Sequence, residues 1–131
     1  MIYFDERWIT ISWDEDLQAV VAEWKAFAET KDFRAGLEAG LSLARKKMAT
    51  RWLADTRRAP PSSQEDQQWT SQVWFPRAIA QGVRSMALVV PESAITRMSL
   101  RGIMTKVTSK ELVQEYFPDA AAARAWLASV H

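Results

Sequence analysis

A short charged segment follows a predicted strand near the middle of the chain. Residues 51–56 are typical of a strand, and Asp55, Arg57 and Arg58 stand at its carboxyl end. Clefts in open α/β sheets form at the carboxyl ends of parallel strands, and a following helix start offers free amide N–H groups. These residues are therefore a candidate anion-binding site. The alternative is an ion pair between Asp55 and an arginine that only holds the loop in place.

Two serines come next and belong to the same candidate site. Ser62 and Ser63 each precede an acidic residue, Glu65 or Asp66, by three positions. This is the spacing of a capping box, in which a serine hydroxyl accepts a hydrogen bond from a backbone amide of the first helical turn. The serines could contact a ligand, or they could serve only as caps.

A third group of candidate residues lies on a predicted helix from about Ser93 to Met104. Arg97 and Arg101 are one turn apart on its polar side, and Met98 lies beside them. Methionine gives adaptable apolar contact, and arginine is common in protein interfaces. We expect this helix to offer part of a protein-binding face, with Met104 also contributing. The alternative is that the methionines fill the core while the arginines are solvated.

The chain shows no pattern that predicts catalysis. It has no cysteine, which removes thiolate metal sites and cysteine nucleophiles, and its single histidine is the terminal residue, His131. The acidic run Asp14-Glu15-Asp16 resembles a helix start more than a metal site. Glycine-rich phosphate loops are also lacking. We expect a protein that is not an enzyme and uses no cofactor or metal.

Composition limits the class of protein further. The chain has 131 residues, 48% of them hydrophobic, with seven tryptophans and a formal charge of +1. This length fits a single domain over residues 1–131 with a substantial core. The near-neutral charge argues against nucleic-acid binding, and no apolar run is long enough to span a bilayer. The amino terminus lacks the pattern of a signal peptide, so we expect a cytoplasmic location.

Hydrophobic periodicity predicts alternating strands and helices. The expected strands are residues 2–4, 7–13, 51–56, 83–90 and 112–117. The expected helices are residues 16–30, 33–48, one after Ser63 that Pro76 should kink or divide and Gly82 should end, one from about 93, and one after Asp119. The alternation indicates an α/β fold with a mixed, mainly parallel sheet of about five strands, in which residues 83–90 are central.

Two details of the core can also be predicted. Gly36 and Gly40 lie one turn apart on one helix face, which indicates close approach of a neighbouring backbone. The spacing of the tryptophans is less decisive. Trp24, Trp52, Trp69 and Trp126 fit core stripes, whereas Trp8, Trp13 and Trp74 are harder to bury together.

Several short motifs together resemble one known family. They are Trp52-Leu53-Ala54-Asp55-Thr56-Arg57, Ser63 with Asp66 and Trp69, Gly82 before the buried strand, and Phe117-Pro118-Asp119 with Ala123, Trp126 and Leu127. This set is similar to the SpoIIAA-like domains of the STAS superfamily, in the STAS/SEC14-like branch, over roughly residues 50–128. The resemblance implies a mixed sheet flanked by helices in a small interaction or ligand-sensing module.

The resemblance also raises the question whether Ser62 or Ser63 is phosphorylated. Anti-sigma-antagonist members of the family carry a phosphorylatable serine at the helix start, in an Asp-Ser-x-Gly type motif. Here Ser62 and Ser63 follow two prolines and no glycine succeeds them. This departure favours caps over phosphorylation sites.

Two hypotheses for function follow from these observations. The first is a non-catalytic interaction or regulatory module that self-associates, as a homodimer for example, or docks to a protein partner. The second is a small-ligand binder that holds an apolar, lipid-like molecule with an anionic end. An apolar cavity lined by tryptophan and methionine would favour the second, and a filled core with an exposed apolar face would favour the first.

Overall fold

The computed structural model describes residues 1–130, so His131 and any role predicted for it lie outside the described part. The strands of this part are β1 (Ile2–Asp5), β2 (Ile9–Asp14), β3 (Ala19–Trp24), β4 (Arg51–Asp55), β5 (Ser85–Val89) and β6 (Val113–Phe117). The helices are α1 (Thr30–Lys47), α2 (Gln64–Trp69), α3 (Phe75–Gln81), α4 (Ala94–Met104) and α5 (Ala120–Ser129). A π-helical turn, η1 (Thr70–Trp74), joins α2 to α3.

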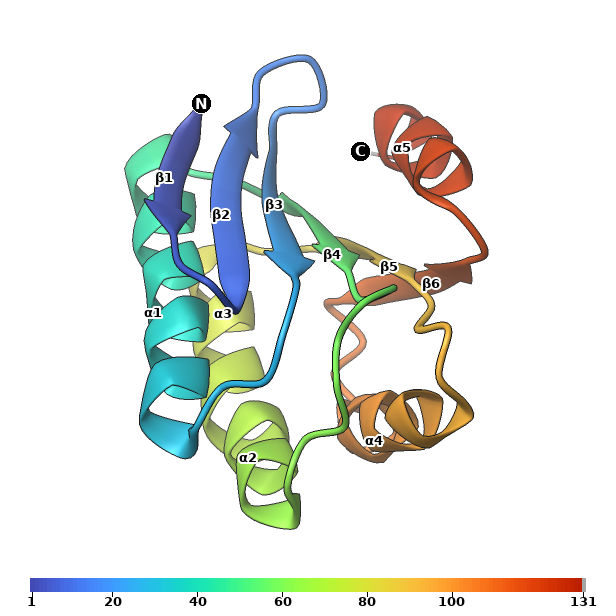
Figure 1. Cartoon of the computed structure of the whole chain (residues 1–131). Helices are drawn as coiled ribbons and strands as arrows, with labels where there is room; N and C mark the ends of the chain where they lie inside the picture. Colours follow the sequence, from blue (N-terminus) through green and yellow to red (C-terminus); the bar gives the residue numbers. More distant parts are fainter. Residues whose placement is uncertain (131) are drawn as a thin grey trace.

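The strands form one sheet in the order of the sequence, β1-β2-β3-β4-β5-β6. The pairs β1–β2 and β2–β3 are antiparallel, and β3–β4, β4–β5 and β5–β6 are parallel. The expected α/β class with a mixed, mainly parallel sheet is therefore confirmed, with six strands rather than about five. Figure 1 shows the sheet and the helices that connect its parallel strands.

The predicted helix over residues 16–30 is wrong, because most of this segment forms β3. Leu17 donates its amide to Oδ1 of Asp14, and Gln18 has a positive φ of 54°, so a tight turn sends the chain back along β2. The pairing then runs without a break from Asp14↔Ala19 to Ile9↔Trp24. Valine-rich segments suit a strand as well as a helix face, and the ladder with β2 decides between them.

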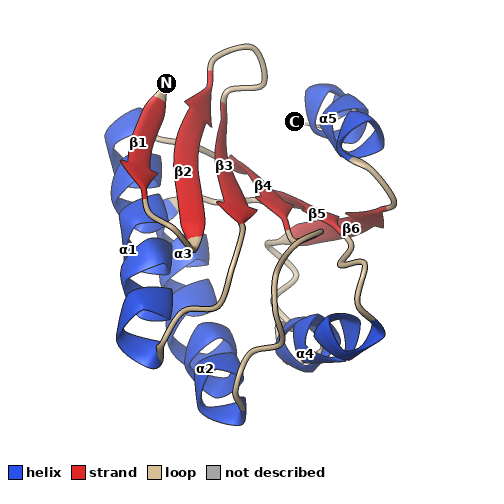
Figure 2. Cartoon of the chain, viewed as in Figure 1, coloured by secondary structure: helices blue, strands red, loops and turns tan. Residues whose placement is uncertain are grey.

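Helices cover both faces of the sheet, as Figure 2 shows. The helices α1, α3 and α4, together with η1, pack on one face around a large core cluster, and α5 packs on the other face around a smaller one. All five residues of β5 are buried, and the strand lies between β4 and β6, so the predicted interior position is confirmed. The middle of the sheet is formed by β3 and β4, and β5 lies next to the edge strand β6. No helix within residues 1–130 is long and apolar enough to cross a membrane.

Helix α1 lies tight against the sheet at its two glycines. A Cβ atom placed on Gly36 would lie 3.1 Å from Cγ2 of Ile9, and one placed on Gly40 would lie 3.0 Å from Cζ2 of Trp52 and closer still to Cη2. The close approach was predicted, but side chains rather than a backbone occupy the space. A glycine at position 40 therefore makes room for an indole.

The helical segment after β4 follows its local signals. Ser63 is the N-cap of α2 and accepts a hydrogen bond from the Asp66 amide at 3.1 Å. The π-turn η1 divides the segment just before Pro76, which stands in the first turn of α3, where a missing amide proton costs least. Gly82 ends α3 with φ of 113°, as its position predicts.

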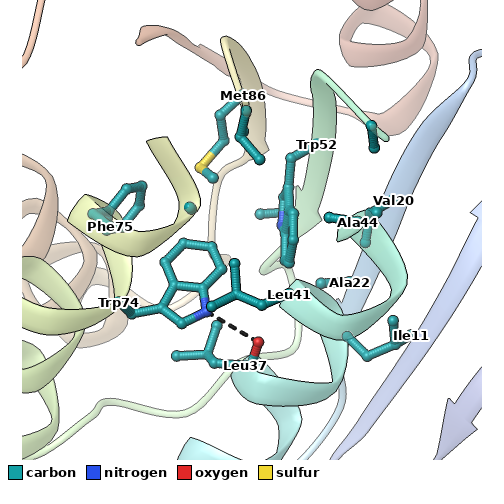
Figure 3. Packing of buried hydrophobic residues seen from close by; sticks show 14 of the residues in the cluster. Ile11, Val20, Ala22, Leu37, Leu41, Ala44, Trp52, Trp74, Phe75 and Met86 are labelled. Atoms are coloured by element: carbon teal, nitrogen blue, oxygen red, sulfur yellow. Dashed lines mark hydrogen bonds between the residues drawn. The ribbon is translucent and has the colours of Figure 1, made fainter. Parts of the chain in front are cut away.

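Burial of the tryptophans differs from the expectation. Trp13 and Trp74 are only 6% and 1% exposed, whereas Trp24, Trp69 and Trp126 are only partly buried. Figure 3 shows how Trp74 fits, with its indole N–H donating to the Leu37 carbonyl at 3.0 Å. A buried indole needs such a partner, and helix α1 provides it from a distant part of the sequence.

Candidate functional site

A cavity lies on the side of the sheet that faces α1, α2 and α4. Its volume is about 220 Å³, and it is partly open to solvent. Strands β4 and β5 contribute Ala54, Met86 and Leu88, and the segments 26–30 and 59–63, which follow β3 and β4, line it further. The cavity therefore lies at the carboxyl ends of parallel strands, where open α/β sheets bind ligands. Figure 1 shows these strand ends above α2 and α4.

The walls of the cavity are mainly aromatic and aliphatic. The aromatic and methionine side chains that line it are Trp24, Phe27, Phe33, Trp52, Trp74, Phe75, Met86 and Met104. Trp52 and Trp74 meet edge to face with ring centroids 5.0 Å apart, and Trp24 stacks on Phe33 at 5.1 Å. Such mutual packing holds the rings in position, so this wall is preformed.

The rim of the cavity carries an exposed aromatic side chain. Phe27 is 63% exposed, although it lines the cavity, and it lies in the segment between β3 and α1. Pro60 and Pro61 line the cavity from the segment after β4. An exposed phenylalanine beside an apolar cavity extends the apolar surface from the interior toward solvent.

Polar groups reach the cavity from α2, η1 and α4. Thr70 is satisfied, because its hydroxyl donates to the Asp66 carbonyl at 2.7 Å. The side chains of Asp66 and Thr96 differ, since Oδ1 of Asp66 and Oγ1 of Thr96 are both buried without a hydrogen-bond partner. Buried polar groups are usually hydrogen-bonded, so these two atoms are the positions in the cavity where a ligand could form hydrogen bonds.

The predicted anion site at the end of β4 is a cluster of ion pairs. Arg57 holds Asp55 with two hydrogen bonds of 3.0 and 2.7 Å, and Arg58 lies 3.0 Å from a carboxylate oxygen of Glu23. Burial raises the pKa of Asp55, but the hydrogen bonds and charge of Arg57 outweigh burial and hold this pKa below its usual value. The ion pair that the alternative interpretation expected is present. These residues line a separate polar hollow together with Glu92.

The two serines lie at the rim of the apolar cavity, apart from the arginines' hollow. Ser63 caps α2, as described above. The Ser62 amide donates to Oγ of Ser99 on α4 at 3.3 Å, and its carbonyl accepts from Nε2 of Gln67 at 2.9 Å. Of the two serines, only Ser63 has a side-chain capping bond. Both serines line the apolar cavity.

The candidate residues of α4 point away from the cavity. Arg97 donates to the carbonyls of Pro91 and Glu92 at 3.0 and 3.1 Å, and Met98 is 70% exposed. Arg101 is exposed as well. The expectation that Met104 adds to this face is wrong, because it is 2% exposed and packs in the core.

Sequence reasoning missed Asp66 and Thr96 as candidates for binding. In the sequence Asp66 stands out only through the capping-box spacing and the family resemblance, and Thr96 belongs to no motif. The one available signal was position, since Asp66 and Thr96 are each the third residue of their helix, α2 and α4, and both are buried. Among residues 1–130, no group of three or more histidine, cysteine, aspartate or glutamate side chains could hold a metal ion.

Comparison of the chain with protein-family models, curated proteins and solved structures finds no match. The function must therefore be inferred from the geometry of the site.

Proposed function

We propose that this protein is a small-ligand-binding module that holds an apolar molecule in the cavity between the sheet, α1, α2 and α4. The observation that carries the proposal is the cavity itself, about 220 Å³ in volume and walled by tryptophan, phenylalanine and methionine. Ligand sites in proteins are typically concave, mostly apolar and supplied with a few polar groups. This cavity has each of these properties.

Packing energetics support the same proposal. Protein interiors are close-packed and contain few voids larger than a water molecule, because an unfilled apolar void loses dispersion contacts. Water would gain little along most of this wall, since indole faces and aliphatic carbons offer it no hydrogen bonds. An apolar ligand would restore the lost contacts and remove the wall from water at about 25 cal/mol per Å².

The family resemblance supports a ligand-sensing role as well. The STAS/SEC14-like branch implies a mixed sheet flanked by helices, and this chain has such a sheet. As part of the proposal, we infer that this chain has the fold of that family and binds a ligand as the family's ligand-binding members do. The cavity favours ligand binding over the purely protein-docking role that the sequence also suggested.

Native mass spectrometry of freshly purified protein tests the proposal, because it reports any retained small molecule and the oligomer mass together. Extraction into organic solvent would identify a molecule lost in the gas phase. The matched variant is Ala54→Leu, which places three further carbons in the floor of the cavity, where Ala54 is 7% exposed. The control is Ala121→Leu, which makes the same change at an exposed position of α5 on the other face.

We expect retained ligand in the wild type and in Ala121→Leu, and a loss of at least tenfold in Ala54→Leu. The proposal fails if wild-type protein retains no molecule and no apolar probe raises its melting temperature. It also fails if Ala54→Leu binds as the wild type does, because the cavity would then not be the site.

A second candidate function, protein docking on α4, is supported by a separate surface. Ile95 and Met98 are 65% and 70% exposed on adjacent turns, with Arg97 and Arg101 beside them. An exposed apolar group with a cationic border suits an acidic partner surface or a second copy of the chain.

The double substitution Arg97→Glu with Arg101→Glu tests this docking face. It removes the Arg97 hydrogen bonds to the Pro91 and Glu92 carbonyls but no core contact, so the fold should remain. It should weaken self-association or partner binding at low salt, where charge effects are least screened. A charge-matched control is Lys31→Glu with Arg45→Glu on the exposed side of α1. Unchanged association of the α4 variant would show that this face is not an interface.

A further inference from the structure

We propose that the ligand of the cavity carries a hydrogen-bond-donating, cationic head of the amine type, which bonds to Asp66 and Thr96, on an apolar body. This inference rests on the proposed function and specifies the chemistry of its ligand. It also replaces the anionic end that the sequence had suggested.

The first observation is the buried carboxyl group of Asp66. The residue is 5% exposed, lines the cavity, and has a buried Oδ1 without a hydrogen-bond partner. A carboxylate oxygen can only accept hydrogen bonds, so a group that completes this site must donate one. An ammonium or amidine donor would form a charge-assisted bond, which is stronger than a bond between neutral groups.

The second observation is the hydroxyl of Thr96 in the same cavity. Thr96 is 3% exposed, and its Oγ1 is buried without a partner. Its backbone amide is already bonded to the capping hydroxyl of Ser93 at 3.3 Å, so the free group is the side chain. A hydroxyl can accept a hydrogen bond from the same head that bonds to Asp66.

The third observation is the distribution of charge around the cavity. Among residues 1–130, no lysine or arginine lines it, and the charged side chains that do are Glu29 and Asp66. The nearby arginines of the β4 loop, Arg57 and Arg58, are bonded to Asp55 and Glu23 in the separate hollow. An anionic head would therefore meet like charge and no cation, whereas a cationic head meets opposite charge.

Helices α2 and α4 pack against each other, so Asp66 and Thr96 line the same cavity from neighbouring helices. Gln67 of α2 bonds to the Ser62 carbonyl at 2.9 Å and fills the space where a side chain at position 102 of α4 would begin. Gly102 thus permits the close approach of the two helices. A preformed pair of polar groups loses little entropy when a ligand binds.

Three probes with one six-carbon chain and different heads test the inference: hexylamine, hexanol and hexanoate. Their affinities for the wild type are measured by isothermal titration calorimetry and by the rise in melting temperature. We expect the order hexylamine, hexanol, hexanoate, with the amine about ten- to a hundredfold tighter than hexanoate. The formal net charge of the whole chain is +1, so overall charge cannot produce a preference for the amine.

Two near-isosteric variants test whether Asp66 and Thr96 cause the preference for the amine. Asp66→Asn should weaken hexylamine by at least about tenfold and change hexanol little, and Thr96→Val should weaken both amine and alcohol by several-fold. Without probe, Asp66→Asn should melt close to the wild type, because asparagine keeps the size and shape of the side chain and the backbone cap to Ser63. Ala54→Leu should weaken all three probes alike, because it fills the cavity that holds the shared chain.

The outcomes separate this inference from the proposed function. Binding of all three probes with equal affinity, or tightest binding of hexanoate, overturns the inference and leaves cavity binding intact. Failure of every probe to bind overturns both. A preference for the amine that persists unchanged in Asp66→Asn also overturns the inference, because the head would then lie elsewhere.

Discussion

Replacement of Gly40 by alanine measures how tightly α1 packs on the floor of the cavity. The new Cβ would lie 3.0 Å from Cζ2 of Trp52 and closer to Cη2, and Trp52 is 2% exposed. Overpacking of this kind costs about 3 kcal/mol when the neighbour cannot move away. The higher helix propensity of alanine returns about 1 kcal/mol, so we expect a net loss of about 2 kcal/mol.

Urea unfolding followed by circular dichroism would measure this loss, and thermal unfolding should show a decrease of roughly 7 °C at about 3 to 4 °C per kcal/mol. The control is Ala35→Gly at an exposed position of the same helix, which isolates the propensity effect at about 1 kcal/mol. A Gly40→Ala protein that is more stable than the wild type by the propensity difference alone would refute the packing argument. Trp52 would then not press against α1.

Three further outcomes follow from the structure. Ser63→Ala should destabilise the protein by about 1 kcal/mol in urea unfolding, and Ser62→Ala by clearly less, because only Ser63 has a side-chain capping bond; equal losses would contradict this assignment. Burial raises the pKa of Asp55, but Arg57 lowers it by more, so the pKa in the folded protein is below that in the unfolded chain. The ion pair therefore stabilises the fold above about pH 3.9, and this stabilisation is lost as the pH falls through the pKa of the folded state. Stability of Asp55→Asn should therefore vary less with pH below about 4 than that of the wild type, and parallel acid curves would count against the pair. Hydrogen exchange should be slowest in β5, and slow exchange confined to the edge strands β1 and β6 would contradict its buried interior position.

The sequence by itself determined the elements whose signals are local. Ser63, Ser93 and Asp119 each cap the helix that follows, as a short polar side chain at a helix start predicts. The apolar stripe of α1 and the continuous apolar run of β5 placed these two elements correctly. Capping bonds and amphipathic stripes depend on residues a few positions apart, so a sequence contains the whole signal.

Only the tertiary structure decided β3 and the burial of the tryptophans. The spacing of apolar residues within 16–30 suits a helix. In the structure, the backbone groups of β3 that face β2 are hydrogen-bonded along the whole antiparallel ladder. This pairing depends on another strand, so the pattern within residues 16–30 does not contain it. Trp74 could be buried because the Leu37 carbonyl, far away in the sequence, accepts its indole N–H. Interactions between distant segments override local preference in both places.

The tertiary structure also determined most of the candidate site. Asp55, Arg57 and Arg58 could be found from the sequence because they are neighbours, and the structure brings them together as ion pairs. The cavity exists because α1, α2 and α4 leave space between themselves and the sheet. Asp66 and Thr96 line it from two different helices and are about thirty positions apart in the sequence. A void has no sequence pattern, because it is set by the difference between the packing distance of whole elements and the volumes of the side chains between them.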